Sequence, residues 1–288
     1  MTTTAAPPTA PAKALLMLNK VPQIVLIFWI IKILSTTVGE TFADFLNDRM
    51  GFGLNGTSLV MSALFLIALV VQLTRKRYVP AVYWTVVVLV SVVGTLISDN
   101  LVDNLGIPLS TTSIAFGAAL AVVFAAWWWS ERTLSVHSIR TTKRELFYWA
   151  AILFTFALGT SAGDLVAEAS GIGYALSALG FAGLIAVTAF AYYVFKVNGI
   201  LAFWTAYVLT RPLGASMGDL LSQTHQDGGL GLGTTATSAI FLLVILSLVT
   251  YLSITHRDFI PEPDESDGPT LSADTVETTK PIFQPDAG

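Results

Sequence analysis

One residue pattern occurs four times in this chain, and each copy lies inside a long apolar stretch. In each copy a Trp is followed ten residues later by a Gly, and five residues after that by an Asp. The copies are Trp29/Gly39/Asp44, Trp84/Gly94/Asp99, Trp149/Gly159/Asp164 and Trp204/Gly214/Asp219. Because a carboxylate is expensive in hydrocarbon, its recurrence at one position of a repeating unit indicates that a positive charge meets it there.

The composition is that of an integral membrane protein. Of the 288 residues, 54% are hydrophobic and only 12% are charged, which is too apolar for an ordinary soluble domain. Apolar windows long enough to cross a bilayer occur at about 22–46, 57–74, 80–103, 111–130, 146–168, 174–195, 199–221 and 235–255. We therefore expect an all-α polytopic membrane protein with eight transmembrane helices.

The spacing of the Trp residues predicts how these helices are related. Successive repeated Trp residues are 55, 65 and 55 positions apart, which indicates two duplicated pairs of repeats. The four repeats cover about 22–74, 80–130, 146–195 and 199–255. Each repeat holds two spans, so every repeat enters the membrane from the same side and the repeats are parallel. Spans 1, 3, 5 and 7 are expected to gather around an axis along the membrane normal.

The two ends of the chain are predicted to be disordered cytoplasmic tails, at 1–17 and 258–288, around a transmembrane domain of residues 18–257. The first is rich in Thr, Ala and Pro, and the second is acidic, so neither buries enough apolar surface to fold. Eleven basic residues fall on the side that the two ends share, against Arg49 alone on the other. The positive-inside rule therefore places both termini in the cytoplasm.

Further acids and polar groups accompany the repeated Asp residues. On an α-helix, positions i and i+4 share a face, so a second acceptor four residues after each Asp extends an acidic stripe. The predicted cation ligands are Glu40, Asp44, Asp99, Asp103, Asp164, Glu168 and Asp219. The predicted secondary ligands are Asp48, Gln223, Thr95, Thr160, Ser98 and Asn100.

Small and basic residues complete the predicted site. Small side chains let helix backbones approach closely, and the glycines in register are Gly39, Gly94, Gly159 and Gly214. Lys32 and Arg211 lie inside spans, where they are expected either to pair with the carboxylates or to gate the site by competing with the cation. Pro212 is expected to kink or break the seventh span. The repeated Trp residues are expected to form an interface belt or to pack.

The ligand set predicts the kind of ion. Carboxylates, hydroxyls and amides without any Cys suit hard cations such as Mg²⁺, Ca²⁺ and Mn²⁺, of which we favour Mn²⁺. Repulsion between clustered acids favours proton uptake when the cation leaves, so protons are the expected counter-ion. The chain has no phosphate loop, nucleophile elbow or paired helical His motif, and we expect no enzymatic activity and no cofactor.

The preferred interpretation is a divalent metal cation transporter with a carboxylate-lined site between spans 1, 3, 5 and 7. Its expected partners are membrane lipids, the inorganic cation and protons, with no nucleic acid. Two alternatives are a cation channel with an acidic selectivity ring and a non-transporting protein. The latter would be a sensor or an intramembrane enzyme with a structural ion site.

Four segments resemble those of a bacterial family described as uncharacterised membrane-anchored proteins. They are KILSTTVGETFADFLN, VGTLISDNLVDNLG, FALGTSAGDLVAE and LTRPLGASMGDLLSQ. The resemblance extends over residues 18–257 and implies a location in the bacterial inner membrane. It implies no activity.

Overall fold

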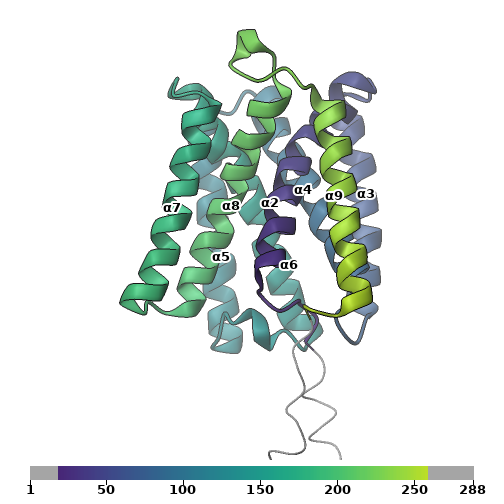
Figure 1. The fold of residues 1–288 in the computed structure, drawn as a ribbon, viewed down its shortest axis with the longest axis vertical. Coiled ribbons are helices and arrows are strands. Elements are labelled where there is room, and N and C mark those ends of the chain that lie inside the picture. The colour runs from purple at the N-terminus through teal and green to yellow at the C-terminus, as the bar shows by residue number, and fades with distance from the viewer. Residues whose placement is uncertain (1–18, 259–288) are drawn as a thin grey trace, which may run out of the picture.

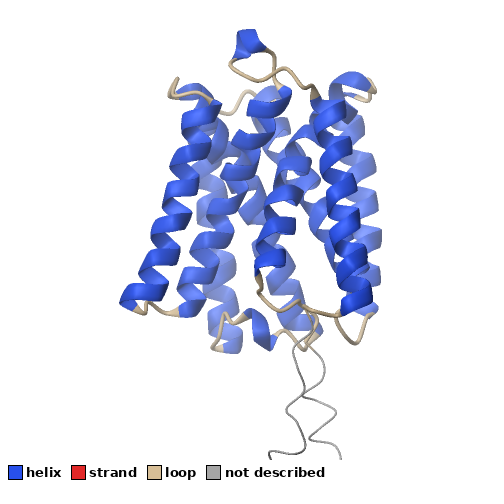
Figure 2. Cartoon of the chain, viewed as in Figure 1, coloured by secondary structure: helices blue, strands red, loops and turns tan. Residues whose placement is uncertain are grey.

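A computed structural model describes residues 19–258, and within this range the chain forms eight long helices and no strand (Figure 2). They are α2 (Leu26–Asp44), α3 (Gly53–Thr74), α4 (Pro80–Asp99), α5 (Leu109–Glu131), α6 (Thr142–Asp164), α7 (Tyr174–Phe195), α8 (Gly199–Ser222) and α9 (Thr234–Thr255). The helices stand side by side (Figure 1). The predicted all-α class is confirmed.

Short helical turns follow several of these helices. Three are π-helical: η1 (Phe45–Arg49), η2 (Asn100–Asn104) and η4 (Leu165–Ala169). Two are 3₁₀-helical: η3 (Val136–Ser138) and η5 (His225–Asp227). The predicted tails lie outside the described residues, except for Asp258, which is buried.

Seven of the eight helices are long and apolar enough to cross a membrane. The exception, α8, has 24 residues and carries both Arg211 and Asp219, which are buried in the bundle. Large apolar side chains such as Leu59, Ile114 and Leu176 are exposed on the outer helices α3, α5 and α7. An apolar exterior around a polar interior is the arrangement that a bilayer requires.

Helices α2, α4, α6 and α8, the first helix of each repeat, form a closed inner ring. Each contacts the next, and α8 closes the ring against α2. The repeat glycines lie at these contacts: Gly39 against Ser91, Gly94 against Phe156, Gly159 against Arg211, and Gly214 against Thr36. Each partner stands three residues before the glycine of the next repeat. A Cβ at any of the four glycines would clash, so these contacts set the spacing of the ring.

The second helix of each repeat packs outside the inner ring, on the first helix of the following repeat. Helix α3 contacts α4, α5 contacts α6, α7 contacts α8, and α9 returns to contact α2. The four repeats are therefore interlocked. The gathering of their first helices around one axis is what the Trp spacing predicts.

Both ends of the described chain lie at one end of the bundle, which we call the terminal end; α2 begins and α9 finishes there, at the bottom of Figure 1. The Gln23 amide donates to the Asp258 carbonyl oxygen at 2.8 Å, and the Tyr78 amide donates to Asn19 at 3.1 Å. The Lys20 ammonium forms a buried ion pair with Glu145 at 2.6 Å. These contacts tie the ends of the described chain to each other, to the segment before α4 and to the first turn of α6.

An aromatic layer fills the inner ring near the terminal end. It consists of Phe28, Tyr83, Trp84, Tyr148, Trp149, Phe203 and Trp204, all buried. In each repeat an aromatic residue precedes the Trp, so the layer receives two rings from each inner helix except α2, whose Trp29 is only half-buried. The Tyr83 and Tyr148 hydroxyls are hydrogen-bonded at 2.5 Å. Of the two roles expected for the repeated Trp residues, packing is the one seen for Trp84, Trp149 and Trp204.

Candidate cation site

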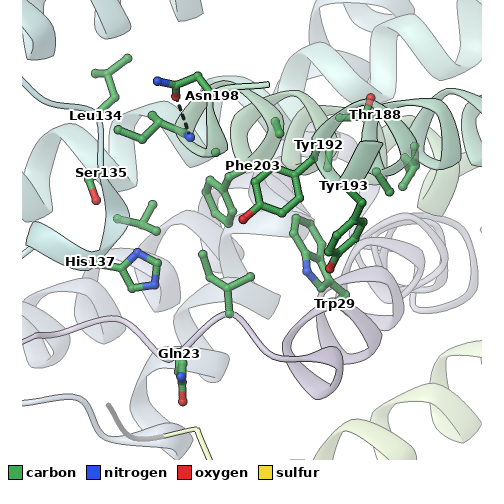
Figure 3. Close-up of a pocket in the computed structure, with 18 residues that line it drawn as sticks. Gln23, Trp29, Leu134, Ser135, His137, Thr188, Tyr192, Tyr193, Asn198 and Phe203 are labelled. Carbon is green, nitrogen blue, oxygen red and sulfur yellow. Dashed lines mark hydrogen bonds between the residues drawn. The ribbon is translucent and has the colours of Figure 1, made fainter. Parts of the chain in front are cut away.

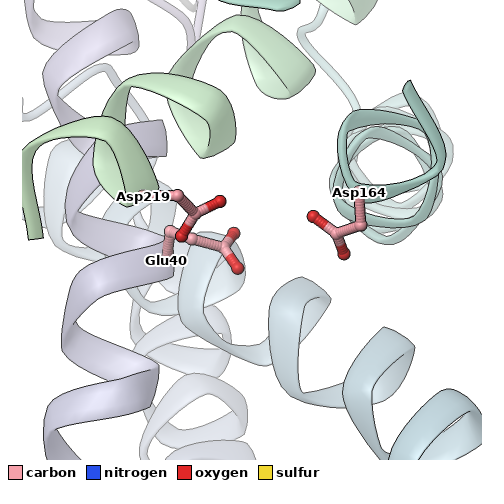
Figure 4. Close-up of side chains that lie close together, drawn as sticks. All are labelled: Glu40, Asp164 and Asp219. Atoms are coloured by element: carbon pink, nitrogen blue, oxygen red, sulfur yellow. The ribbon is translucent and has the colours of Figure 1, made fainter. Parts of the chain in front are cut away.

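Three carboxylates converge where the inner helices finish, away from the terminal end. Glu40 of α2, Asp164 of α6 and Asp219 of α8 each offer one oxygen, and the three oxygens lie within 4.8 Å of one another. Figure 4 shows these side chains pointing into one space between their helices. Glu40 and Asp219 are each only 6% exposed, and Asp164 is half-buried. We call these three residues the acid cluster.

The two remaining repeated acids lie close to this cluster. Asp99, the last residue of α4, is half-buried and interacts electrostatically with Glu40, Asp164 and Asp44. Asp44 also interacts with Asp164 and Asp219. The four inner helices therefore turn their repeated acids toward a shared interior.

The polar residues four positions after each repeated Asp, where the structure describes their side chains, do not join the acid cluster. Asp103 and Glu168 are exposed, and Glu168 accepts a hydrogen bond from the Tyr174 hydroxyl at 2.9 Å. Gln223 follows the end of α8 with an extended backbone. The side chain of Asp48 lies outside the described residues. Neither Asp103 nor Glu168 belongs to the acid cluster.

A change of helix type accompanies this placement. The π-turns η1, η2 and η4 begin directly after Asp44, Asp99 and Asp164. A π-turn closes its hydrogen bonds between residues i and i+5, so the backbone is wider there than in the expected α-helix. Asp103 and Glu168 still interact electrostatically with Asp99 and Asp164, the first members of their pairs, although both side chains are exposed. π-turns are frequent at functional sites.

Arg211 connects α8 to the other three inner helices. Its Nη2 donates to Glu40 Oε2 at 3.0 Å, to Thr160 Oγ1 at 2.7 Å and to Thr95 Oγ1, and its Nη1 donates to the Thr36 carbonyl at 3.3 Å. The side chain is fully buried. A kink or a break was expected at Pro212, and helix α8 continues through this residue without a break. The partners of Arg211 on α4 and α6 are thus two of the predicted secondary ligands.

The repeat explains how the guanidinium group is accommodated. Glu40, Thr95 and Thr160 each follow a repeat glycine by one residue, and the fourth residue at this position is Ala215. Because Ala215 is small and fully buried, it leaves the middle of the ring to Arg211 from its own helix. Ala215 was missed as a contributor to the site, although the register of the repeat marks its position.

Lys32 is also fully buried but does not reach the acid cluster. Its Nζ lies 3.9 Å from the ring centre of Phe156 and 4.3 Å from that of Tyr207. It has no hydrogen-bond partner among the described residues. The Lys32 side chain is therefore held on aromatic faces, between the aromatic layer and Arg211.

The remaining predicted secondary ligands join helices to one another. The Ser98 and Ser161 hydroxyls lie 2.7 Å apart, between α4 and α6. The Asn100 amide donates to the Ser58 hydroxyl at 2.7 Å and to the Leu96 carbonyl at 2.6 Å. These bonds position the ends of the inner helices and direct neither side chain into the acid cluster.

A separate cavity of about 750 Å³ lies near the terminal end (Figure 3). It is lined by α2, α7, α8 and the segment before α6, with Trp29, His137, Tyr192 and Phe203 among the side chains. No carboxylate lines it. It is therefore distinct from the acid cluster and lacks the ligands that a hard cation prefers.

Fold and site together define a helical membrane protein of four parallel two-helix repeats with clustered acids at the end of the inner ring. Four segments match a family described as a repeat of unknown function (DUF347), at residues 27–78, 82–133, 147–198 and 202–258. The chain belongs to this family, and each match spans one two-helix repeat of the structure. No protein of curated function and no solved structure is significantly similar to the chain.

Proposed function

We propose that this protein transports a hard divalent cation across the membrane, with a Mn²⁺-like ion favoured over Mg²⁺ or Ca²⁺. The observation that carries the proposal is the convergence of Glu40, Asp164 and Asp219, from three different repeats, within 4.8 Å. Ionisable residues inside a membrane protein mark ion pathways more often than they serve packing. An all-oxygen ligand set selects hard cations.

Protons are the proposed counter-ion. When the cation leaves, three carboxylates so close together repel one another strongly in a region of low dielectric constant. Proton uptake relieves that repulsion, and cation binding releases the protons again. Exchange of protons for the cation would couple transport to the proton gradient without any cofactor, and the proposal assigns no enzymatic activity.

The side chains between the acid cluster and the terminal end favour a carrier over a channel. Parallel repeats around one axis are compatible with a pore lined by an acidic ring. Here, however, the interior of the ring contains Arg211, then Lys32, then the aromatic layer, all buried. A continuous ion path would have to pass the Arg211 guanidinium group, the Lys32 side chain and several aromatic rings, so access from alternating sides is the better account.

We further propose that the protein resides in the bacterial inner membrane with both termini in the cytoplasm. Most basic side chains of the described range belong to the terminal end, including Arg75, Lys76, Arg77, Arg132 and Arg140. The positive-inside rule then assigns the terminal end to the cytoplasm. The acid cluster would face the outer side, and the cation, protons and membrane lipids would be the partners.

Uptake into proteoliposomes tests the proposal. We expect the purified protein to take up Mn²⁺ with saturation and with movement of protons in the opposite direction. Asp164→Asn combined with Asp219→Asn should reduce uptake at least about tenfold, because two of the three ligands lose their charge. Asp227→Asn, at an exposed acid in the turn between α8 and α9 and away from the Trp–Gly–Asp pattern, is the matched control and should transport normally.

Other results would select the alternatives. Unchanged uptake by the double variant would remove the basis for the proposed site. Ohmic single-channel currents would identify a channel. Tight stoichiometric binding without flux would identify a sensor or another protein with a structural ion.

A further inference from the structure

The guanidinium group of Arg211 lies in the middle of the inner ring, at the level of residues that stand one helical turn before the repeated Asp residues. This group bonds to residues of α2, α4 and α6 while the backbone of Arg211 belongs to α8. One side chain thus contacts all four repeats near the level of the repeat glycines, where neighbouring inner helices approach closely. A cation entering from the acid cluster would meet this positive charge first.

The acceptors around Arg211 do not satisfy it completely. Its Nε has no hydrogen-bond partner among the described residues, although the side chain is 0% exposed. A buried donor without an acceptor costs free energy. This bonding is what we expect of a group that is held in one state of the protein and released in another.

Glu40 is shared by two groups of contacts. Its Oε2 accepts from Arg211 Nη2 at 3.0 Å, and the same carboxylate belongs to the acid cluster. A divalent cation coordinated by Glu40, Asp164 and Asp219 would lie within a few ångströms of the guanidinium group, where like charges repel strongly in a medium of low dielectric constant. The cation and Arg211 therefore cannot both hold Glu40 at full strength.

We propose that Arg211 is a tethered cation that competes with the transported cation for Glu40. Substrate binding releases Arg211 from Glu40 and opens the interior of the inner ring. Arg211 returns to Glu40 when the substrate leaves. Between these events its charge excludes other cations from the interior, as an arginine does at the constriction of a selective pore. This inference rests on the proposed function and adds to it the gate of the same site.

Mn²⁺ binding to purified full-length variants tests the competition. Arg211→Gln keeps the Cβ and Cγ atoms that pack on Gly159 but removes the guanidinium group, so we expect Mn²⁺ to bind at least about tenfold more tightly than to the wild type. Arg211→Lys keeps the charge and should bind within about threefold of the wild type. Equal or weaker binding by a folded Arg211→Gln variant would overturn the competition.

A second variant covers the case in which Arg211→Gln does not fold. Thr160→Val has nearly the same shape but removes one acceptor of the guanidinium group, which donates to Thr160 at 2.7 Å. Weaker retention of Arg211 should make Mn²⁺ bind a few-fold more tightly. Unchanged or weaker Mn²⁺ binding by this variant would contradict the proposal.

A thiol-labelling experiment separates the gate from the proposed function. The chain has no cysteine, and Val87 is buried at the repeat position equivalent to Lys32, below Arg211. In proteoliposomes, Val87→Cys should resist a charged thiol reagent in the wild-type background and react in the Arg211→Gln background. Protection of the cysteine in both backgrounds would show that Arg211 is not the group that blocks the ring. If the labelling depends on Arg211 while the protein binds no divalent cation, that result would refute the proposed substrate but would still support Arg211 as the group that blocks the ring.

Discussion

Gly159 lies directly against the side-chain stem of Arg211: a Cβ on residue 159 would overlap the Cβ and Cγ atoms of the arginine and come within 3.0 Å of Pro212. The absence of a side chain on α6 is what admits the arginine of α8 into the middle of the ring. The equivalent contact of the preceding repeat is Gly94 against Phe156, so the same register holds a hydrophobic contact there and a charged one here.

We predict that Gly159→Ala destabilises the protein. The added methyl group must displace either the stem of Arg211 or the α6–α8 contact, and overpacking of this kind costs about 1–3 kcal/mol. Thermal unfolding in detergent measures the effect. Gly180→Ala in α7 is the matched control, because a Cβ there meets nothing within 4 Å, and it should unfold at or above the wild-type temperature. Equal stability of the two variants would show that the close approach is not needed.

The buried ion pair at the terminal end predicts a second stability effect. Lys20 and Glu145 are 7% and 1% exposed, and Gln72 donates to the other carboxylate oxygen at 2.9 Å. Glu145→Gln leaves the Lys20 ammonium without its counter-charge, and the loss should be about 3 kcal/mol. Glu131→Gln, which affects the more exposed pair with Arg144, should have a smaller effect. An unchanged unfolding temperature for Glu145→Gln would contradict this prediction and would mean that water hydrates the Lys20 ammonium in place of the carboxylate.

A pH dependence is expected from Asp258 at the same end. Burial raises the pKa of its carboxyl group, although the Tyr78 hydroxyl donates to it at 2.5 Å and acts in the opposite direction. The folded state therefore binds the proton more tightly than the unfolded state, so this residue's contribution to stability falls as pH rises from the unfolded pKa through the raised one. Asp258→Asn should remove this loss.

Unfolding temperatures of the wild type and Asp258→Asn, measured side by side from acid to neutral pH, check that prediction. The difference in favour of the variant should grow with pH across the interval. A constant difference would show that Asp258 has the same pKa in both states.

The inner ring followed from the sequence because one register repeats four times. The Trp–Gly–Asp spacing fixes the same helix face in each repeat, so the parallel arrangement and the convergence of Asp164 and Asp219 are consequences of a single pattern. The composition likewise predicts a membrane protein, since apolar stretches of this length are typical of transmembrane helices.

Other features depend on tertiary contacts that no local pattern carries. A π-turn follows Asp164 where the sequence predicted a continuing α-helix, and Glu168 within it is exposed. The partners of Arg211 come from three other helices, so their geometry is set by ring closure. The packing of each outer helix on the next repeat is equally non-local, because the hairpin connection alone favours neither neighbour.

The account depends most directly on whether a cation lies between Glu40, Asp164 and Asp219. Anomalous diffraction from crystals grown with Mn²⁺ measures this without assuming any transport activity. We predict an anomalous peak at about 2.2 Å from one oxygen of each carboxylate, with Arg211 Nη2 withdrawn from Glu40. No peak at this position, with Mn²⁺ bound instead only at exposed acids such as Asp103 or Glu168, would contradict the account.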